Sequence, residues 1–492
     1  MVDSFFPKIF FISRIKKKGI LEGGTVNGAN LSLYKDDKMK NFLPNEIVKS
    51  CDYLERGLSF QLRGLCACTT ATKSSPILAT TDELKNQTAT YDKIVQRRME
   101  IFEAMNGLRD MDIEGCKDCA NICQKPYKDV NFEWGGGKNL PAGFSIQHYT
   151  MCNERCHYCC YAQNNEFYPP QYDILYVYEL FRKQGRLGRN NWIDLSGGEP
   201  ALLKNFDEIL KYMMSNNMGT VVVYSNCSIF SPVLFEGLRN NKIILTTSLD
   251  TGLRSTYARL RGRDYFEKVV DNLIRYRNSG TKNLWLKYVI TDENRTEDDL
   301  WSFVFVMLAI HPNSVMISPD FPYGDKQIPE ETVKFAAKLW YMLETYMPDS
   351  WLQDYTSAFG DKKFIQYREA MFAELERLKS SDVKHMNDII DAIPNTERIA
   401  IWGAGGMAKK LLDETNLVKK HIVRVYDSSK TERKFLELNV KQFDPRDIES
   451  GDVESIVITS RRFQSEILHN LKPYKDKVKI IKLFDRQLEL YR

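Results

Sequence analysis

Three cysteines, Cys152, Cys156 and Cys159, lie close together in the spacing CxxxCxxC. Three thiolates on one loop suit an iron–sulfur cluster, and the alternatives are a zinc site or free thiols. A cubane cluster held by only three protein thiolates keeps one iron open to another ligand, whereas an electron-transfer cluster is commonly held by four. The spacing therefore predicts a metal-binding loop with chemistry at an open iron.

A second candidate group, Gly197, Gly198 and Glu199, follows a short apolar segment at 192–195 in the order Leu-Ser-Gly-Gly-Glu-Pro. Glycines let the backbone approach a ligand closely. A carboxylate accepts hydrogen bonds, and an ammonium group, such as an amino-acid-bearing cofactor carries, supplies donors. The alternative is a tight turn whose glutamate caps a helix.

Both groups fall where apolar strands alternate with helical segments, a pattern typical of an α/β fold with a parallel sheet. The predicted strands are 143–148, 192–195, 220–224, 243–249, 283–290 and 314–318, and the predicted helices are 173–186, 203–216, 231–239, 264–279, 297–310 and 330–346. Six such units indicate an open or incomplete βα barrel, whose chemistry belongs at the C-terminal ends of its strands.

An aromatic residue, Tyr158, precedes the third cysteine, and the Gly-Gly-Glu-Pro turn follows one βα unit later. Over about residues 142–325 this combination strongly resembles the radical S-adenosylmethionine (SAM) enzymes. The resemblance implies a partial (β/α)6 barrel in which Cys152, Cys156 and Cys159 hold a [4Fe-4S] cluster and SAM chelates the open iron. It also implies that eight residues contact the cofactor: Tyr158, Gly197, Gly198, Glu199, Ser225, Asn226, Ser248 and Asp250. For the last four of these, the alternative is that they are ordinary residues of βα loops.

The resemblance further implies that a reduced cluster cleaves SAM and that the resulting 5′-deoxyadenosyl radical abstracts hydrogen from a substrate C–H bond. Such an enzyme is oxygen-sensitive and needs a reductant such as flavodoxin or ferredoxin. Arg254, Arg259, Arg261 and Arg263 follow the fourth strand. They are either receptors for a SAM carboxylate or a phosphorylated substrate, or solvated helix charges.

Six more cysteines lie upstream, and four thiolates from two distant pairs can close a metal site. Their sequence context resembles the auxiliary-cluster region of SPASM-type radical SAM proteins, displaced here to a position before the barrel. The resemblance implies an auxiliary [4Fe-4S] cluster, with structural zinc and free thiols as alternatives. The predicted ligands are Cys51, Cys66, Cys116 and Cys119, with Cys68 and Cys123 as substitutes.

The last part of the chain restarts with an apolar strand and then places Gly403, Gly405 and Ala408 in GxGxxA spacing before a helix. Asp427 ends the next predicted strand, where a ribose-binding acid would stand. The segment resembles the Rossmann-like domains of nucleotide-sugar and surface-glycan enzymes, which implies that Gly403, Gly405 and Asp427 bind a nucleotide. An empty scaffold or an interaction domain is the alternative.

Length, charge and apolar runs indicate how the chain is divided and where it acts. The chain has 492 residues and a formal net charge of +4, which is too balanced to indicate nucleic-acid binding. We find no apolar run long enough to span a membrane and no secretory signal, so we expect a cytoplasmic protein. The predicted division is a lead-in (1–45), an auxiliary-cluster region (46–141), the partial barrel (142–350), a helical connector (351–396) and a Rossmann-like domain (397–492).

Taken together, these features predict a radical SAM enzyme whose substrate is a small molecule or is carrier-linked. A nucleotide- or carrier-linked sugar, changed by dehydrogenation, epimerisation or rearrangement, is the favoured substrate. The alternatives are a peptide-modifying radical SAM maturase and a non-catalytic iron–sulfur or redox-sensing protein.

Overall fold

A computed structural model describes residues 42–68, 75–117, 119, 121–130, 143–185, 187, 192–216, 218–320, 327–358, 362–428, 434–461 and 463–484. Most of the predicted lead-in, residues 1–41, lies outside these ranges. The chain forms two compact units, the first comprising residues 1–336 and 349–369 and the second comprising 337–348 and 370–492.

The first unit is built on a sheet of ten strands in the order β12-β11-β10-β9-β8-β7-β6-β2-β3-β4. Its centre is the run of parallel strands predicted from sequence: β6 (Gly143–Gln147), β7 (Trp192–Leu195), β8 (Thr220–Tyr224), β9 (Ile243–Ser248), β10 (Leu284–Ile290) and β11 (Ser314–Pro319). Among the described residues β4 and β12 are the two edges, so the sheet is open. This confirms the α/β fold class.

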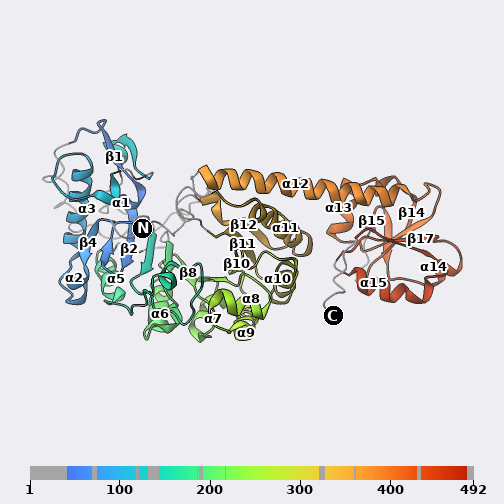
Figure 1. Cartoon of the computed structure of the whole chain (residues 1–492), viewed down its shortest axis with the longest axis horizontal. Coiled ribbons are helices and arrows are strands. Elements are labelled where there is room, and N and C mark those ends of the chain that lie inside the picture. The colour runs from blue at the N-terminus through green and yellow to red at the C-terminus, as the bar shows by residue number, and fades with distance from the viewer. Residues whose placement is uncertain are drawn as a thin grey trace, which may run out of the picture. The chain divides into compact units, whose positions relative to one another are not determined.

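Helices connect these strands (Figure 1). They are α4 (Cys160–Gln163), α5 (Ile174–Lys183), α6 (Phe206–Ser215), α7 (Pro232–Arg239), α8 (Arg254–Arg261), α9 (Phe266–Arg277), α10 (Glu297–Ile310) and α11 (Glu330–Tyr346). Side-chain caps start several of them; Asp173, for example, accepts from the amide of Leu175 at 2.9 Å. The apolar faces are buried, as in α6, where Phe206, Ile209 and Leu210 enter the core.

The sheet is longer than the sequence pattern indicates. On one side β2 (Gly57–Gln61) pairs in parallel with β6, and β3 (Gly64–Cys66) and β4 (Ile77–Thr80) follow as antiparallel strands. On the other side β12 (Trp351–Asp354) pairs in parallel with β11. The cysteine-rich region therefore continues the barrel sheet, and the segment predicted as a helical connector begins with a strand.

The rest of the N-terminal region packs beside this extension. It contains α1 (Asp52–Arg56), α2 (Thr81–Lys85), α3 (Tyr91–Met105), and a small sheet in which β1 (Ile47–Ser50) pairs with β5 (Cys123–Pro126) in antiparallel fashion. Ser50 lies opposite Cys123 in this sheet. The pairing therefore brings the residue after β1, Cys51, to the end of the small sheet at which the 116–123 loop enters β5.

The second unit has a six-stranded sheet in the order β15-β16-β14-β13-β17-β18. Its strands are β13 (Ile399–Trp402), β14 (Ile422–Tyr426), β15 (Lys434–Phe435), β16 (Leu438–Lys441), β17 (Ser455–Ile458) and β18 (Lys479–Lys482), all parallel except β15. Helices α13 (Gly406–Glu414), α14 (Arg446–Glu449), α15 (Gln464–Leu471) and the end of α12 (Lys362–Asp391) accompany it. Two apolar clusters form its core.

Candidate functional site

The cysteine triplet lies on the loop between β6 and α4. At the start of this loop the amide of Thr150 donates to the carbonyl of Tyr168 at 2.9 Å. Further on, the amide of Arg155 donates to the carbonyl of Arg261, the last residue of α8, at 2.8 Å. Backbone hydrogen bonds thus fix the loop at the C-terminal end of the parallel strands, where the sequence predicts the chemistry.

The three thiols differ in their surroundings. Burial raises the pKa of Cys152 to about 12 and also raises the pKa of Cys156. The neighbouring Cys160 thiol instead lowers the pKa of Cys159. Thiols bind metal as thiolates, so buried thiols such as Cys152 and Cys156 need a nearby cation to offset their burial.

The Gly-Gly-Glu turn packs directly on this loop. The amide of Gly198 donates to the carbonyl of Tyr149 at 3.3 Å, and the amide of Glu199 donates to that of Met151 at 2.9 Å. A Cβ on Gly197 would lie 2.5 Å from the Tyr149 oxygen, and one on Gly198 would lie 2.0 Å from the Met151 oxygen. The glycines therefore allow the turn to touch the cysteine loop.

Glu199 is buried and organises the neighbouring strand end. Its carboxylate accepts from the hydroxyl of Ser225 at 2.8 Å and from the amides of Asn226 at 2.6 Å and Ala201 at 3.0 Å. Asn226 in turn donates to Asn153 of the cysteine loop at 2.8 Å. Because a carboxylate has about four acceptor positions, Glu199 keeps one for a further donor such as an ammonium group. Burial raises the pKa of Glu199 to about 7.

Asp250 is the centre of a second network. Its carboxylate accepts from the Tyr158 hydroxyl at 2.6 Å, from the Arg261 guanidinium at 2.5 Å and from the Val289 amide at 2.8 Å. Arg261 also donates to the carbonyl of Ser248. The structure thus brings together Tyr158, Ser248 and Asp250, and it adds Arg261 as the group that joins them.

The four arginines after β9 do not act as one cluster. Arg254 pairs at the surface with Asp264 at 2.8 Å, and Arg259 pairs at the surface with Glu293 at 2.7 Å. These two are solvated helix charges. Arg261, by contrast, has a side chain that is only 6% exposed.

Comparison with known proteins identifies the family to which this domain belongs. A family model described as the radical SAM superfamily matches residues 146–304, a range that holds the cysteine triplet, the Gly-Gly-Glu turn and Asp250. This chain contains a radical SAM domain.

The radical SAM domain has distant relatives. A probable GTP 3′,8-cyclase of Saccharolobus solfataricus is 24% identical over 160 residues, which are 32% of this chain and 49% of that protein. The chain thus spans about half the length of this curated relative. Streptococcus suis SuiB bound to S-adenosylmethionine is similar with TM-score 0.36 and 15% identity, covering 45% of this chain and 53% of that one. SuiB bound to its precursor peptide SuiA gives TM-score 0.37 and 13% identity, covering 67% and 74%.

The residues of the radical SAM domain fit a cluster and a polar ligand. In the described ranges no three His, Cys, Asp or Glu side chains already surround one ion position. A cubane does not need this, because each thiolate binds a different iron. Within the same ranges the hydroxyl of Ser196 and the Nε of Arg261 are buried without a hydrogen-bond partner. Buried polar groups are usually satisfied, so these two indicate a missing polar neighbour.

The inner face of the barrel sheet carries charged groups that sequence reasoning missed. Tyr288 packs on Phe303 of α10, so its neighbour Lys287 points to the opposite face, where its Nζ lies 3.4 Å from the centre of the Tyr355 ring. Burial lowers the pKa of Lys287 to about 7. On β7, burial raises the pKa of Asp194 to about 7. Both residues lie within short, mostly apolar strands, so no pattern in the sequence marks them as functional.

Upstream of the radical SAM domain, four cysteines are electrostatic neighbours. Burial raises the pKa of Cys51 to about 12, and repulsion from the thiolates of Cys68, Cys116 and Cys119 contributes. Cys116, whose pKa is also raised to about 12 by burial, interacts with Cys68 and Cys119. The buried guanidinium of Arg98 interacts with Cys51 and Cys68 and supplies a nearby positive charge.

The other two upstream cysteines are placed differently. Cys66, predicted as a ligand, is fully buried on β3, and its charged neighbours are Arg63 and Cys68. Cys123 is exposed, and its thiol donates to the carbonyl of Ser50 at 3.5 Å. Electrostatic interactions therefore link Cys68, one of the predicted substitutes, with Cys51 and Cys116, although in the described ranges no three of these side chains surround one ion position.

In the second unit, the predicted nucleotide-binding residues lie together at the C-terminal end of β13. Gly403 has φ of 114°, and a Cβ there would lie 2.9 Å from the side chain of Ser460. A Cβ on Gly405 would meet nothing within 4 Å. The carboxylate of Asp427 accepts from the amide of Ala404 at 2.9 Å, which ties the end of β14 to the glycine turn.

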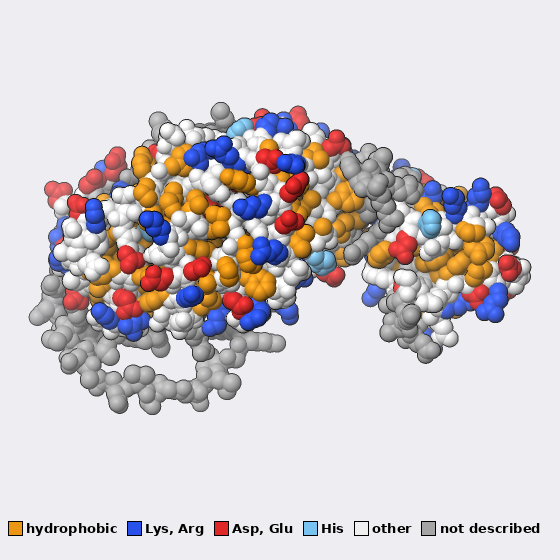
Figure 2. Space-filling model, turned by 90° about the horizontal axis from the view of Figure 1, so that it is seen from below, with side chains coloured by type: hydrophobic (Ala, Val, Ile, Leu, Met, Phe, Trp, Pro, Cys, Tyr) orange, Lys and Arg blue, Asp and Glu red, His pale blue; other side chains and the backbone are white. Residues whose placement is uncertain are grey.

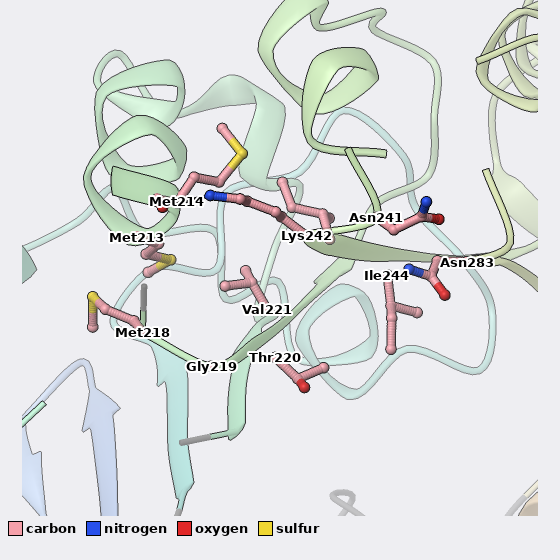
Figure 3. A pocket seen from close by; sticks show the side chains of 11 residues that line it. Met213, Met214, Met218, Gly219, Thr220, Val221, Asn241, Lys242, Ile244 and Asn283 are labelled. Atoms are coloured by element: carbon pink, nitrogen blue, oxygen red, sulfur yellow. Dashed lines mark hydrogen bonds between the residues drawn. The ribbon is translucent and has the colours of Figure 1, made fainter. Parts of the chain in front are cut away.

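The first unit also has a surface hollow, which lies away from the cysteine triplet and Glu199. Met213, Met218, Thr220 and Lys242 are among its lining residues, and Figure 3 shows them around the beginnings of β8 and β9. In βα sheets, catalytic groups lie at the opposite, C-terminal ends of the parallel strands.

On the face seen in Figure 2, acidic and basic side chains are interspersed. No helix in the described part of the chain is long and apolar enough to cross a membrane.

Proposed function

We propose that this chain is an enzyme that reductively cleaves SAM and uses the 5′-deoxyadenosyl radical to abstract hydrogen from a substrate C–H bond. One observation carries the proposal: a cysteine triplet, a glycine–glutamate turn and the Asp250 network meet at the C-terminal end of one parallel sheet, within the radical SAM domain. When bound, the cluster would supply one electron to the sulfonium of SAM, whose C–S bond then breaks.

The protein's own share is positioning. Cys152, Cys156 and Cys159 would ligate the cluster, and the loop hydrogen bonds hold them at the mouth of the sheet. Glu199 has one acceptor position left for the SAM ammonium group. The inner face of the sheet, with Lys287, would face the substrate. A flavodoxin or ferredoxin is the proposed electron donor, since the chemistry needs a low-potential electron.

The test is anaerobic reconstitution followed by iron and sulfide analysis and a 5′-deoxyadenosine assay after dithionite reduction. We expect wild type to make deoxyadenosine, and C156A to lose that product together with about four irons. The matched control is C160S, which alters the next cysteine after the triplet and keeps a hydroxyl donor for Cys159. Deoxyadenosine from C156A would refute the cluster assignment. A wild type that binds iron and makes no deoxyadenosine would favour a non-catalytic iron–sulfur protein.

For the substrate we propose a nucleotide- or carrier-linked sugar. The supporting observation is the second unit, whose parallel strands follow the order β16-β14-β13-β17-β18. That is the order of doubly wound nucleotide-binding sheets, which bind ligands where the order reverses, here between β13 and β17. Gly403 lies at this point, and open space adjoins Gly405. A peptide substrate is the alternative, and it predicts no nucleotide binding by the second unit.

We also propose an auxiliary cluster in the N-terminal region, ligated by Cys51, Cys68, Cys116 and Cys119. Their mutual electrostatic interactions and the buried Arg98 support this set. Four thiolates around one cluster carry a net negative charge, and a buried cation offsets part of it. Zinc bound by the same four thiolates is the alternative, which iron analysis distinguishes.

A further inference from the structure

Arg261 is a buried cation that contacts the cysteine triplet. It ends α8, and Gly262 after it has φ of 63°, so the chain turns sharply away. A Cβ on Gly262 would lie 2.9 Å from atoms of Arg155, which shows how closely the helix end meets the cysteine loop. The backbone of Arg261 accepts from the Arg155 amide at 2.8 Å. Main-chain contacts thus fix the helix end that carries the guanidinium.

The guanidinium reaches one cluster ligand directly. Its Nη1 donates to the sulfur of Cys156 at 3.3 Å, and its Nη2 donates to the carboxylate of Asp250 at 2.5 Å. Glu154 lies close to both groups, with its Oε2 at 3.7 Å from Nη1 and at 3.7 Å from the Cys156 sulfur. Both carboxylates are almost fully buried. A group held this way is not free to swing out toward a ligand carboxylate, so its Nη1 stays beside the Cys156 sulfur.

The two acids are themselves held in place. The hydroxyl of Tyr257 donates to Glu154 at 2.5 Å, and the hydroxyl of Tyr158 donates to Asp250 at 2.6 Å. The guanidinium carbon of Arg261 lies 5.5 Å from the centre of the Tyr158 ring and 5.8 Å from the centre of the Tyr257 ring. One positive and one negative group therefore flank the Cys156 sulfur in a rigid, poorly solvated setting, where charges act strongly.

We propose that Arg261 raises the reduction potential of the cluster bound through Cys156 and that Glu154 lowers it; this rests on the proposed function. Reduction adds one electron, and its negative charge spreads onto the sulfur ligands. A charge-assisted N–H···S hydrogen bond stabilises that charge, and hydrogen bonds to sulfur are a recognised determinant of cluster potential. Arg261 acts through Cys156 and is thus a positioning residue. The buried Nε of Arg261, which lacks a partner in the described ranges, leaves a second donor for the cluster.

The experiment is an anaerobic redox titration of the reconstituted full-length protein, followed by electron paramagnetic resonance of the signal that changes when SAM is added. We expect R261Q to lower the ratio of reduced to oxidised cluster at a fixed potential about tenfold, which is about 59 mV for one electron. R261K keeps the charge and should fall between R261Q and wild type. E154Q should shift the potential in the opposite direction.

The matched control is R259Q, which removes an arginine from the same helix whose partner, Glu293, is at the surface. It should leave the potential unchanged. If R261Q does not take up iron, R261K and E154Q still test the proposal through their opposite shifts. Unchanged potentials in the variants that bind iron would overturn it. A wild type without a SAM-sensitive signal would instead refute the proposed function.

Discussion

Glu199 combines burial with three hydrogen bonds, and this combination governs how its site responds to pH. Burial raises the pKa of its carboxyl to about 7, although three donors favour the charged form. In the unfolded chain the same group has a pKa near its ordinary value of 4.5. The folded state therefore binds the proton more tightly, and ionising Glu199 costs stability progressively between pH 4.5 and about 7.

This shift predicts how SAM binding depends on pH. Only the carboxylate attracts an ammonium group, so SAM affinity should be constant above about pH 7 and should fall up to tenfold per pH unit below it. Calorimetric titration of the anaerobic, reconstituted protein measures this. E199Q should bind weakly at every pH and should lose the dependence. A wild-type affinity that stays flat from pH 5 to pH 8 would show that Glu199 does not bind the ammonium group.

The choice between Cys66 and Cys68 as a ligand is also a question at the scale of residues. Two positions apart on one chain segment, they differ in their electrostatic neighbours, and only Cys68 interacts with both Cys51 and Cys116. We expect C68S to lose about four irons while C66S keeps them. Iron analysis of the two purified variants measures this, and the converse result would restore Cys66 as the ligand. If neither loses iron but zinc is present, the site is a zinc site.

Sequence spacing located the cysteine triplet and Glu199 because these residues stand near one another in the chain or directly follow strands. It could not identify Arg261 as the partner of Cys156, because 105 residues separate the two in the chain. The sequence pattern also does not distinguish a ligand-binding arginine from a solvated helix charge. Spacing likewise does not distinguish Cys66 from Cys68 as a member of the auxiliary set, and both stay candidates. Which cysteine of a close pair turns toward a distant partner depends on strand pairing, which spacing does not report.

At the scale of elements, the six central strands were predictable because each is a short apolar run followed by a helical pattern. The extension of the sheet was not. β2 pairs with β6 across more than 80 residues of sequence, as in Gly57 with Gly143, and nothing local indicates the pairing. The predicted boundary at 141/142 therefore followed a change of sequence pattern, while the hydrogen bonds of one sheet run across it.

The contact between the glycine turn after β7 and the cysteine loop is the element-level feature with the clearest test. G198A would place a Cβ 2.0 Å from the backbone oxygen of Met151, so turn and loop must separate. We expect a loss of about 1–3 kcal/mol in unfolding free energy, with reduced iron uptake. Urea unfolding and iron analysis measure these. The control G406A adds a Cβ in open space and should be neutral. Normal stability and iron uptake in G198A would show that the contact is dispensable.

For the whole molecule, each of the two units has a sheet of its own, so we expect a ligand of one unit to stabilise that unit alone. A ligand that binds only the folded state at about 100 times its Kd stabilises by about 2.7 kcal/mol, which corresponds to roughly 4 °C for the larger first unit and roughly 10 °C for the smaller second unit. Cluster assembly should act on the first unit and a nucleoside diphosphate such as UDP on the second.

Differential scanning calorimetry of the full chain tests this division. We expect two transitions. The first should move to a higher temperature when the cluster is reconstituted and to a lower temperature when a chelator removes it, and the second should move only when UDP is added. D427A removes the carboxylate that holds the Ala404 amide of the glycine turn, and it should abolish the UDP shift while leaving the cluster shift intact. C156A should do the reverse. If UDP shifts neither transition, the second unit is not a nucleotide-binding domain and a peptide substrate becomes the better proposal; if both ligands shift both transitions, the units unfold as one.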